Sequence, residues 1–157
     1  MLKFISKDTN EENVTIEYIE ELEEKWNIKF PPILVEYYLY HNAAEVCEFP
    51  FFRHGIEFSI EFILPLKFGK FSVEHIYDLN QSDEFISDSF IPLAEDTSGE
   101  EYYWDSKNGK VYYLSMQNVE NPIPISNSVE EFFELLNTAY ERSMHKWIFY
   151  HLEALFY

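Results

Sequence analysis

The acidic side chains between residues 95 and 105 are the groups of this sequence best suited to acid–base chemistry. Glu101 and Asp105 would share one face of a β-strand, whereas Glu100 would lie on the other face. A catalytic pair of carboxylates needs a companion histidine, arginine or glycine-rich loop to position it. No such companion stands beside these acids. We therefore interpret them as a solvent-exposed acidic ridge rather than as a catalytic dyad.

Histidines and acidic loops could also bind a metal ion, but their spacing argues against it. His145 and His151 would point in different directions from a helix, and the five histidines share no metal-ligand spacing. Residues 96–101 have a superficial similarity to a calcium loop, yet they lack its alternating Asp/Asn ligands and its final glutamate. The sequence predicts no bound metal. The histidines are His41, His54, His75, His145 and His151.

The sequence also contains no convincing nucleophile and no nucleotide-binding loop. Cys47 is the single cysteine, and no nearby residue would lower the pKa of its thiol, so we expect a small buried side chain. The four glycines are too isolated to form a phosphate-binding loop. We therefore predict no catalytic residue, no cofactor and no enzymatic activity.

Size and charge narrow the class of protein further. A chain of 157 residues most simply forms one domain. Its formal net charge of −18 repels nucleic acid and anionic lipid, so we expect neither as a direct partner. The same charge would speed association with a basic protein, or it serves solubility alone.

No apolar run approaches the roughly 18 residues of a membrane span, and with one cysteine and no leader segment we expect a cytoplasmic protein.

The segment from Phe90 to Ser115 must position the acidic ridge, because it contains three strand-like pieces joined by two turns. Asn108-Gly109 predicts a hairpin with a type I′ turn, which needs positive φ at both central positions. Trp104 would pair with Tyr113 across a two-residue turn, or with Val111 across a four-residue loop. Either register places Tyr102, Trp104, Val111 and Tyr113 on one face, and Tyr103, Asp105, Tyr112 and Leu114 on the other. The first turn, residues 94–101, is acidic and is expected to be exposed.

Helical patterns precede this segment. Residues 15–26 form an amphipathic helix whose glutamates make up its solvated face, and Pro31-Pro32 opens a second helix that ends near Asn42. Residues 43–55 are expected to be a loop with packed aromatic rings, and 72–80 a short helix. Residues 56–68 alternate as a strand that ends or lies at an edge near Pro65. A short strand at Leu2 to Ile5 is the expectation for the start of the chain.

A long C-terminal helix follows the hairpin. Residues 121–126 form an extended connection, and Ser128 with Glu131 forms a capping box. No glycine or proline interrupts residues 126–157, which predicts one long helix or two nearly collinear ones. Such a helix is too long for this domain to cover. Its last turns need a partner, either the aromatic cluster at 49–52 or a second copy of the chain.

The order of these elements resembles the SUKH superfamily, which contains fungal cell-wall-assembly-regulator-like proteins and bacterial immunity proteins. The resemblance covers most of residues 12–140. It departs from the family pattern at Asn42-Ala43-Ala44, where Asn-Gly-Gly is usual, and at Gly99-Glu100, where Gly-Asp is usual. The residues that carry it are Ile19 to Leu22, Phe30-Pro31-Pro32 leading to Leu34, Tyr37 and Tyr38, Ile91 to Asp96 with Gly99-Glu100, Tyr102 to Asp105, and Ser128 to Leu136.

The resemblance implies an α+β fold with a mostly antiparallel β-sheet flanked by two N-terminal helices and a long C-terminal helix. Residues 1–157 would be a single SUKH-like domain, with 143–157 an aromatic helical extension. The function it implies is that of a non-catalytic immunity protein that binds and neutralises a cognate polymorphic toxin, often a nuclease.

We expect the partner to contact the acidic turn and its flanking aromatic residues. A homodimer through the C-terminal helix is a further expectation. The alternative functions are an intracellular regulatory or scaffold module without a toxin partner and, third, an unrecognised hydrolase. The residues assigned to partner binding are Glu95, Asp96, Glu100, Glu101, Tyr103, Asp105 and Tyr112.

Overall fold

The computed structural model describes residues 2–8, 14–42, 44–46, 49–69 and 71–156, and these form four helices and nine strands. One antiparallel sheet contains β1 (Ile5–Asp8), β2 (Ala44–Val46), β5 (Phe62–Ile63), β6 (Phe90–Glu95), β7 (Glu101–Asp105), β8 (Val111–Leu114) and β9 (Ile123–Ser126), in that spatial order. A separate hairpin is formed by β3 (Phe51–Arg53) and β4 (Ile56–Phe58). Cys47 lies outside the described residues.

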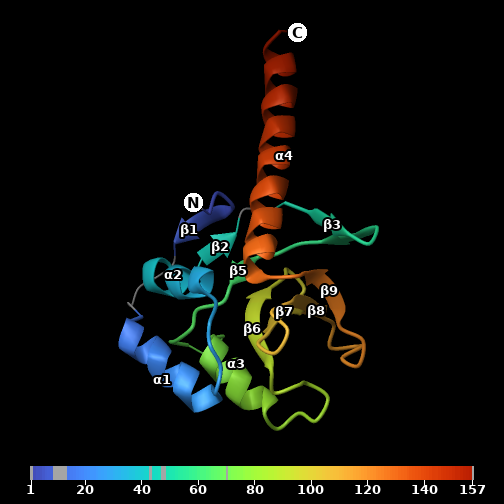
Figure 1. Ribbon diagram of the computed structural model, residues 1–157. Helices are drawn as coiled ribbons and strands as arrows, with labels where there is room; N and C mark the ends of the chain where they lie inside the picture. The colour runs from blue at the N-terminus through green and yellow to red at the C-terminus, as the bar shows by residue number, and fades with distance from the viewer. Residues whose placement is uncertain (1, 9–13, 43, 47–48, 70, 157) are drawn as a thin grey trace.

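Four helices accompany the sheet (Figure 1). Helices α1 (Ile16–Trp26) and α2 (Pro32–Tyr40) lie between β1 and β2 in the chain, and α3 (Val73–Asn80) contacts β6. Helix α4 (Val129–Leu155) follows the sheet as one continuous helix of 27 residues, about 40 Å long at about 1.5 Å per residue. The predicted α+β architecture, with two N-terminal helices and a long C-terminal one, is confirmed.

The first two helices begin and end where the sequence indicates. The Thr15 side chain caps α1 by accepting a hydrogen bond from the Tyr18 amide. Proline occupies the first turn of α2, where a missing N–H costs nothing. Asn42 follows α2 with φ 53°, the left-handed conformation that asparagine tolerates.

The main core lies on one face of the sheet, where all four helices contribute to it. Tyr102 and Trp104 of β7 point into this core, and their strand pairs with Tyr113 and Val111 of β8. The aromatic packing is dense: Tyr102 contacts Phe132 of α4 with a ring separation of 5.6 Å. The predicted division of the β7–β8 hairpin into two faces is therefore confirmed.

The turn between β7 and β8 differs from the prediction. In this turn Gly109 has a positive φ of 79°, whereas Asn108 does not have a positive φ. Trp104 pairs with Val111, so the connection is the four-residue loop. The Asp105 carboxylate accepts a hydrogen bond from the Lys107 amide at 2.9 Å, which stabilises this wider loop.

The two-residue turn with positive φ at both positions lies elsewhere, at His54 and Gly55 between β3 and β4. The prediction of one strand over residues 56–68 is wrong, because β4 pairs with β3 while β5 joins the main sheet. The predicted loop over 43–55 contains β2 and β3. The N-terminal strand lies later than expected, at Ile5–Asp8. The extended connection at 121–126 is a strand from Ile123 onward.

Candidate protein-binding surfaces

Asp96 holds the β6–β7 turn together from the inside. One of its carboxylate oxygens, Oδ1, accepts hydrogen bonds from the amide of Ser98 at 2.8 Å, from the Ser98 hydroxyl at 2.7 Å and from the Glu100 amide at 3.0 Å. The other oxygen accepts a hydrogen bond from the Tyr113 hydroxyl at 3.0 Å. Asp96 is only 7% exposed, so the expectation that the whole acidic turn is exposed is wrong at this residue.

Glu100 and Asp105 are also engaged within the hairpins. The Glu100 carboxylate accepts hydrogen bonds from the Ser115 hydroxyl at 3.1 Å and from the Met116 amide at 2.7 Å, which ties the β6–β7 turn to the end of β8. Asp105 is 8% exposed and caps its own loop. These two acids have structural roles, and Glu100 remains partly accessible.

The outer face of the sheet, opposite the main core, is covered where Tyr103 lies. Tyr103 is 1% exposed and packs in a second small core with Ile86 and Leu114. Its hydroxyl donates to the Glu101 carboxylate and accepts a hydrogen bond from the Asn80 side chain at 3.0 Å. Tyr103 is therefore not a surface anchor in this conformation. Ile86, Leu114 and the ring of Phe90 cover it, and Ile86 is a buried apolar residue within the otherwise polar segment 81–89.

Tyr112 is the more accessible of the two predicted aromatic anchors. Its ring stacks on Phe90 with centroids 5.3 Å apart, and its hydroxyl accepts a hydrogen bond from Asn108 at 3.1 Å. The ring is half-buried, so part of it remains available on the outer face.

Three carboxylates crowd together at the ends of β6 and β7. Glu95 lies directly opposite Glu101 in the strand register. Burial raises the pKa of Glu95, and the charges of Glu61 and Asp96 raise it further. Burial also raises the pKa of Glu101, against the effect of the hydrogen bond from Tyr103. The exposed Glu61, just before β5, thus belongs to this group. We call Glu61, Glu95 and Glu101 the outer acidic cluster.

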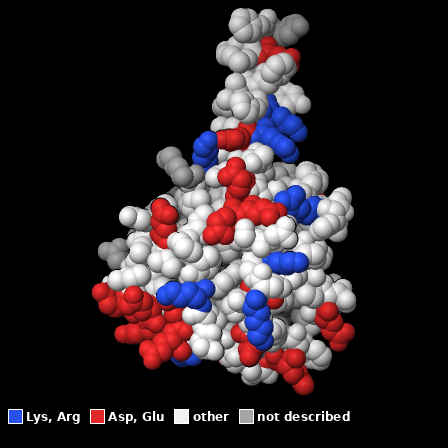
Figure 2. All heavy atoms as spheres, in the orientation of Figure 1, with Lys and Arg blue, Asp and Glu red and all other residues white. Residues whose placement is uncertain are grey.

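A second concentration of acids lies on α1 (Figure 2), over the helix at the lower left of Figure 1. Four of its glutamates are exposed, in agreement with the interpretation of this run as a solvated helix face. They are Glu17, Glu20, Glu21 and Glu24. The interpretation is wrong at Glu23, which is 7% exposed and accepts a hydrogen bond from the Phe30 amide at 2.9 Å.

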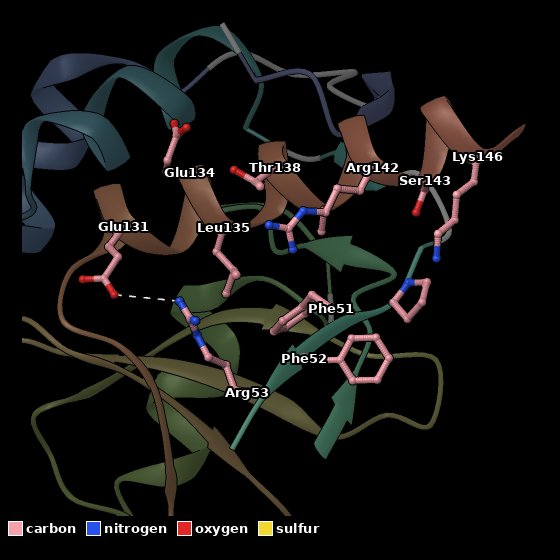
Figure 3. A pocket seen from close by; sticks show the side chains of 12 residues that line it. Phe51, Phe52, Arg53, Glu131, Glu134, Leu135, Thr138, Arg142, Ser143 and Lys146 are labelled. Carbon is pink, nitrogen blue, oxygen red and sulfur yellow. Dashed lines mark ion pairs between the residues drawn. The ribbon is translucent and has the colours of Figure 1, made fainter. Parts of the chain in front are cut away.

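A groove lies between α4 and the β3–β4 hairpin (Figure 3) and has a volume of about 630 Å³. Leu135 and Ala139 of α4 and Phe51 of β3 supply apolar lining. Arg142 and Lys146 line it from α4, and Phe52, 59% exposed, lines it from the hairpin.

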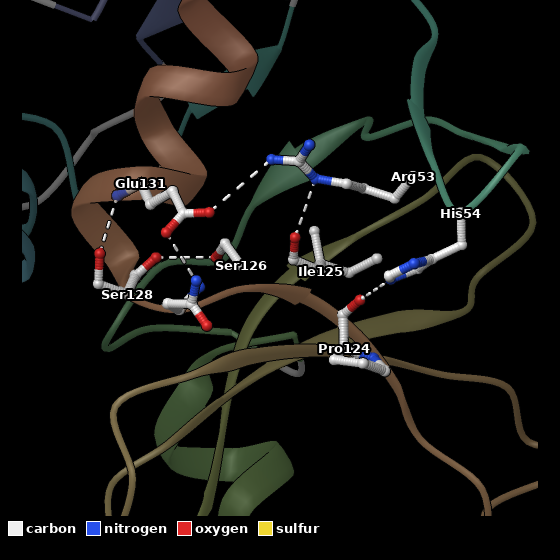
Figure 4. Close-up of polar contacts among 8 residues, drawn as sticks. Arg53, His54, Pro124, Ile125, Ser126, Ser128 and Glu131 are labelled. Atoms are coloured by element: carbon white, nitrogen blue, oxygen red, sulfur yellow. Dashed lines mark hydrogen bonds and ion pairs between the residues drawn. The ribbon is translucent and has the colours of Figure 1, made fainter.

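Polar contacts fix the inner end of this groove (Figure 4). The Arg53 guanidinium donates to the Ile125 carbonyl at 3.0 Å and lies 3.9 Å from the Glu131 carboxylate. The Glu131 amide donates to the Ser128 hydroxyl at 3.0 Å, which confirms half of the capping box. The Glu131 carboxylate accepts a hydrogen bond from the Asn127 amide at 3.3 Å. In a full capping box it would accept this bond from the Ser128 amide, one residue later.

Two classes of site find no support in the described part of the chain. No group of three or more His, Cys, Asp or Glu side chains there could hold a metal ion. No described helix is both long and apolar enough to cross a membrane. What the geometry offers is a set of surfaces suited to binding another protein.

Comparison with known families agrees with this organisation. The profile of the SMI1 / KNR4 family (SUKH-1) matches residues 13–135, which is most of the chain. The protein belongs to this family. The match begins just before α1 and includes both hairpins and all the predicted partner-binding residues. A search of curated proteins finds no match.

The SUKH-1 match ends early in α4, so most of this helix lies beyond it. Figures 1 and 2 show α4 rising out of the body of the protein. From Met144 onward every described residue is exposed. The rings of this segment include Phe149 at 66%, Tyr150 at 70% and Phe156 at 83% exposure. The ring of Phe49 packs on Tyr140 of α4 with centroids 6.1 Å apart, and the turns from Met144 onward stay exposed, so the expected aromatic cluster does not cover the last turns.

Proposed function

We propose that this SUKH-1 protein is a non-catalytic immunity protein that binds and neutralises a cognate protein toxin, in the cytoplasm where that toxin acts. Membership of the family supports an immunity or a regulatory role. The net charge of −18 favours a basic partner, such as a nuclease with a surface adapted to phosphates. Its bacterial relatives in the superfamily are understood to act in this way.

The outer acidic cluster is the observation that carries the proposal. Glu95 and Glu101 face each other in the strand register, and burial first, then the charges of neighbouring carboxylates, raise the pKa of both. A lysine or arginine from a partner would relieve the repulsion between these charges on binding. We therefore retain Glu95, Glu100, Glu101 and Tyr112 as partner contacts. Asp96, Tyr103 and Asp105 hold the surface in shape.

Charge reversal at this cluster, with a matched control, tests the assignment. The variant Glu61→Lys/Glu95→Lys changes two accessible acids of the cluster. The variant Glu20→Lys/Glu24→Lys changes the net charge equally but on α1. With the toxin encoded by the neighbouring gene, we expect the first variant to weaken binding at least about tenfold more than the second. Equal weakening would mean that net charge alone matters, and would remove the cluster from the interface.

Co-expression distinguishes immunity from the regulatory or scaffold alternative. The proposal requires a neighbouring gene whose product is lethal unless this chain is co-expressed. A harmless neighbour that binds the chain would favour the regulatory role.

Self-association through α4 is part of the proposal. The segment 144–156 is apolar on most sides, and such helices are normally buried. Contiguous apolar patches this large mark interaction sites in soluble proteins. A second copy of the chain offers the same surface.

A further inference from the structure

The groove between α4 and the β3–β4 hairpin gathers three cations, Arg53, Arg142 and Lys146, beside the two acids Glu131 and Glu134, and such a concentration of cations is unusual on this chain. Only 11 lysines and arginines stand against 29 acids. Two of them, Arg142 and Lys146, line the groove from α4 beside Arg53 of the hairpin (Figure 3). Arg53 is held by Glu131, but neither Arg142 nor Lys146 forms an ion pair with any residue in the described part of the chain. The groove therefore favours an occupant that brings negative charge and apolar surface together.

The same side of α4 continues beyond the body as a regular stripe. Its residues recur at alternating steps of three and four, the spacing that aligns side chains along one side of a helix that packs on another. The first half of the stripe lies in the groove, and the second half is exposed. In order, the stripe reads Ala139, Arg142, Lys146, Phe149, Glu153 and Phe156.

We propose that the groove of one copy receives the C-terminal turns of α4 from a second copy, in an antiparallel, two-fold symmetric pair. The pair is centred between Trp147 and Ile148. The inference specifies the self-association included in the proposed function, and it is independent of which toxin is bound.

The order of residues in the stripe is complementary to itself in this arrangement. Arg142 of one copy lies opposite Glu153 of the other. Lys146 lies opposite the ring of Phe149, where a cation–π contact is favourable. The small Ala139 lies opposite Phe156, so that the ring of one copy enters the groove of the other. Each of these three pairings occurs twice, because the two-fold axis repeats it.

The exposed area is of the size that a stable dimer needs. On the stripe and its flanks, Phe149, Tyr150 and Phe156 are each more than half exposed. Aromatic side chains can bury about 150–250 Å² each, so these three present on the order of 400 Å² per chain. A typical stable interface buries about 800 Å² per partner. The exposed Leu152 beside the stripe, Phe52 on the second wall of the groove and the long side chains of Arg142 and Lys146 add the rest of the contact surface.

Charge exchange across the pair tests this geometry. Molar mass and dimer dissociation constants would be measured for the full chain and for Arg142→Glu, Glu153→Arg and the double variant. We expect a dimer whose dissociation constant rises at least about tenfold in each single variant, because each creates two like-charge contacts. The double variant restores the pair with its charges exchanged, to within about threefold of the original affinity. Glu120→Arg, an exposed acid between β8 and β9, serves as the control and leaves the mass unchanged.

Two outcomes would overturn the inference. A full chain that is monomeric at about 100 μM would remove the dimer altogether. A dimer that is indifferent to Arg142→Glu, or that the double variant fails to restore, would place the contact elsewhere on α4. Circular dichroism confirms that each variant is folded. Toxin neutralisation by the same variants is a separate readout, so the proposed function and this inference can fail independently.

Discussion

Asp96 shows how an acidic side chain in a turn can be structural rather than a site of recognition. Its four hydrogen bonds join the turn at Ser98 and Glu100 to Tyr113 on β8. The sequence contains the signal for this role, since aspartate at the start of a turn that ends in glycine commonly accepts bonds from the following amides. The same holds for Asp105 at the start of the β7–β8 loop. Net charge alone could not reveal which acids point inward.

Removing the Asp96 carboxylate should therefore destabilise the fold. Asp96→Ala leaves four partly buried hydrogen bonds without their acceptor, and we expect the free energy of unfolding to fall by about 2–3 kcal/mol. Asp88→Ala, which removes an exposed carboxylate paired with Lys107 at 3.4 Å, should cost less than about 1 kcal/mol. Urea unfolding of both variants provides the comparison. Equal losses would show that Asp96 does not organise the turn.

Glu95 leads to a prediction about pH. Its pKa is raised in the folded protein, so the carboxyl group contributes its full share of stability below the unfolded pKa and loses it as the pH rises through the folded pKa. Glu95→Gln has no proton to lose and stays neutral at every pH. We expect this variant to match the original protein near pH 4 and to be more stable by about 0.2–1 kcal/mol at pH 7, where burial and the neighbouring carboxylates disfavour the charged form of Glu95.

Urea unfolding at the two pH values measures this difference. Glu57→Gln, at an exposed acid of β4, is the control and should change stability by less than about 0.5 kcal/mol. A Glu95→Gln variant that is less stable than the original protein at pH 7 would contradict the proposed repulsion in the outer acidic cluster.

At the scale of elements, helices were predicted well because their caps and periodicity are local. Thr15, Ser72 and Ser128 each cap a helix as their positions suggest. Strands β2 and β5 have only three and two residues, too few for a pattern to be recognised. Their pairing depends on contacts between distant segments, which no local signal encodes.

The two hairpins illustrate the same limit. Asn108-Gly109 is a strong sequence signal for a two-residue turn. The Asp105 carboxylate instead stabilises a longer loop through the Lys107 amide. The two-residue turn forms at His54-Gly55, and the Pro124 carbonyl oxygen lies 2.9 Å from His54 Nε2 there. At the β7–β8 turn, a side chain outside the central pair favours the four-residue loop. At the β3–β4 turn, a contact with another strand accompanies the two-residue turn.

Helix α4 has a packed half and an exposed half, and truncation should distinguish their contributions to stability and to self-association. Removing residues 143–157 should leave the unfolding free energy of the monomer within about 1 kcal/mol, because every described residue from Met144 onward is exposed. The shortened chain should also be monomeric by mass measurement. Retention of the dimer would place the contact on the body of the protein and contradict the role of α4.

For the whole molecule, fold and family could be inferred from the order of motifs, whereas the binding surfaces could not. The order of the helices and the β6–β8 segment was readable from residues such as Pro31 and Gly99. The burial of Tyr103 depends on Ile86 and Asn80, which reach it only in the folded chain. The groove depends on the approach of Phe52 to α4, which only the aromatic character of residues 49–52 indicated in advance.

The central claim is that this SUKH-1 protein acts by binding a toxin and not by catalysis. Its most direct test is a titration of the purified toxin, encoded by the neighbouring gene, with increasing amounts of this protein while the toxin's activity is measured. The account predicts a linear loss of activity that is complete at one chain per toxin, with a complex of matching mass. Unchanged toxin activity in excess protein, or complete inactivation by far fewer chains than toxin molecules, would contradict it.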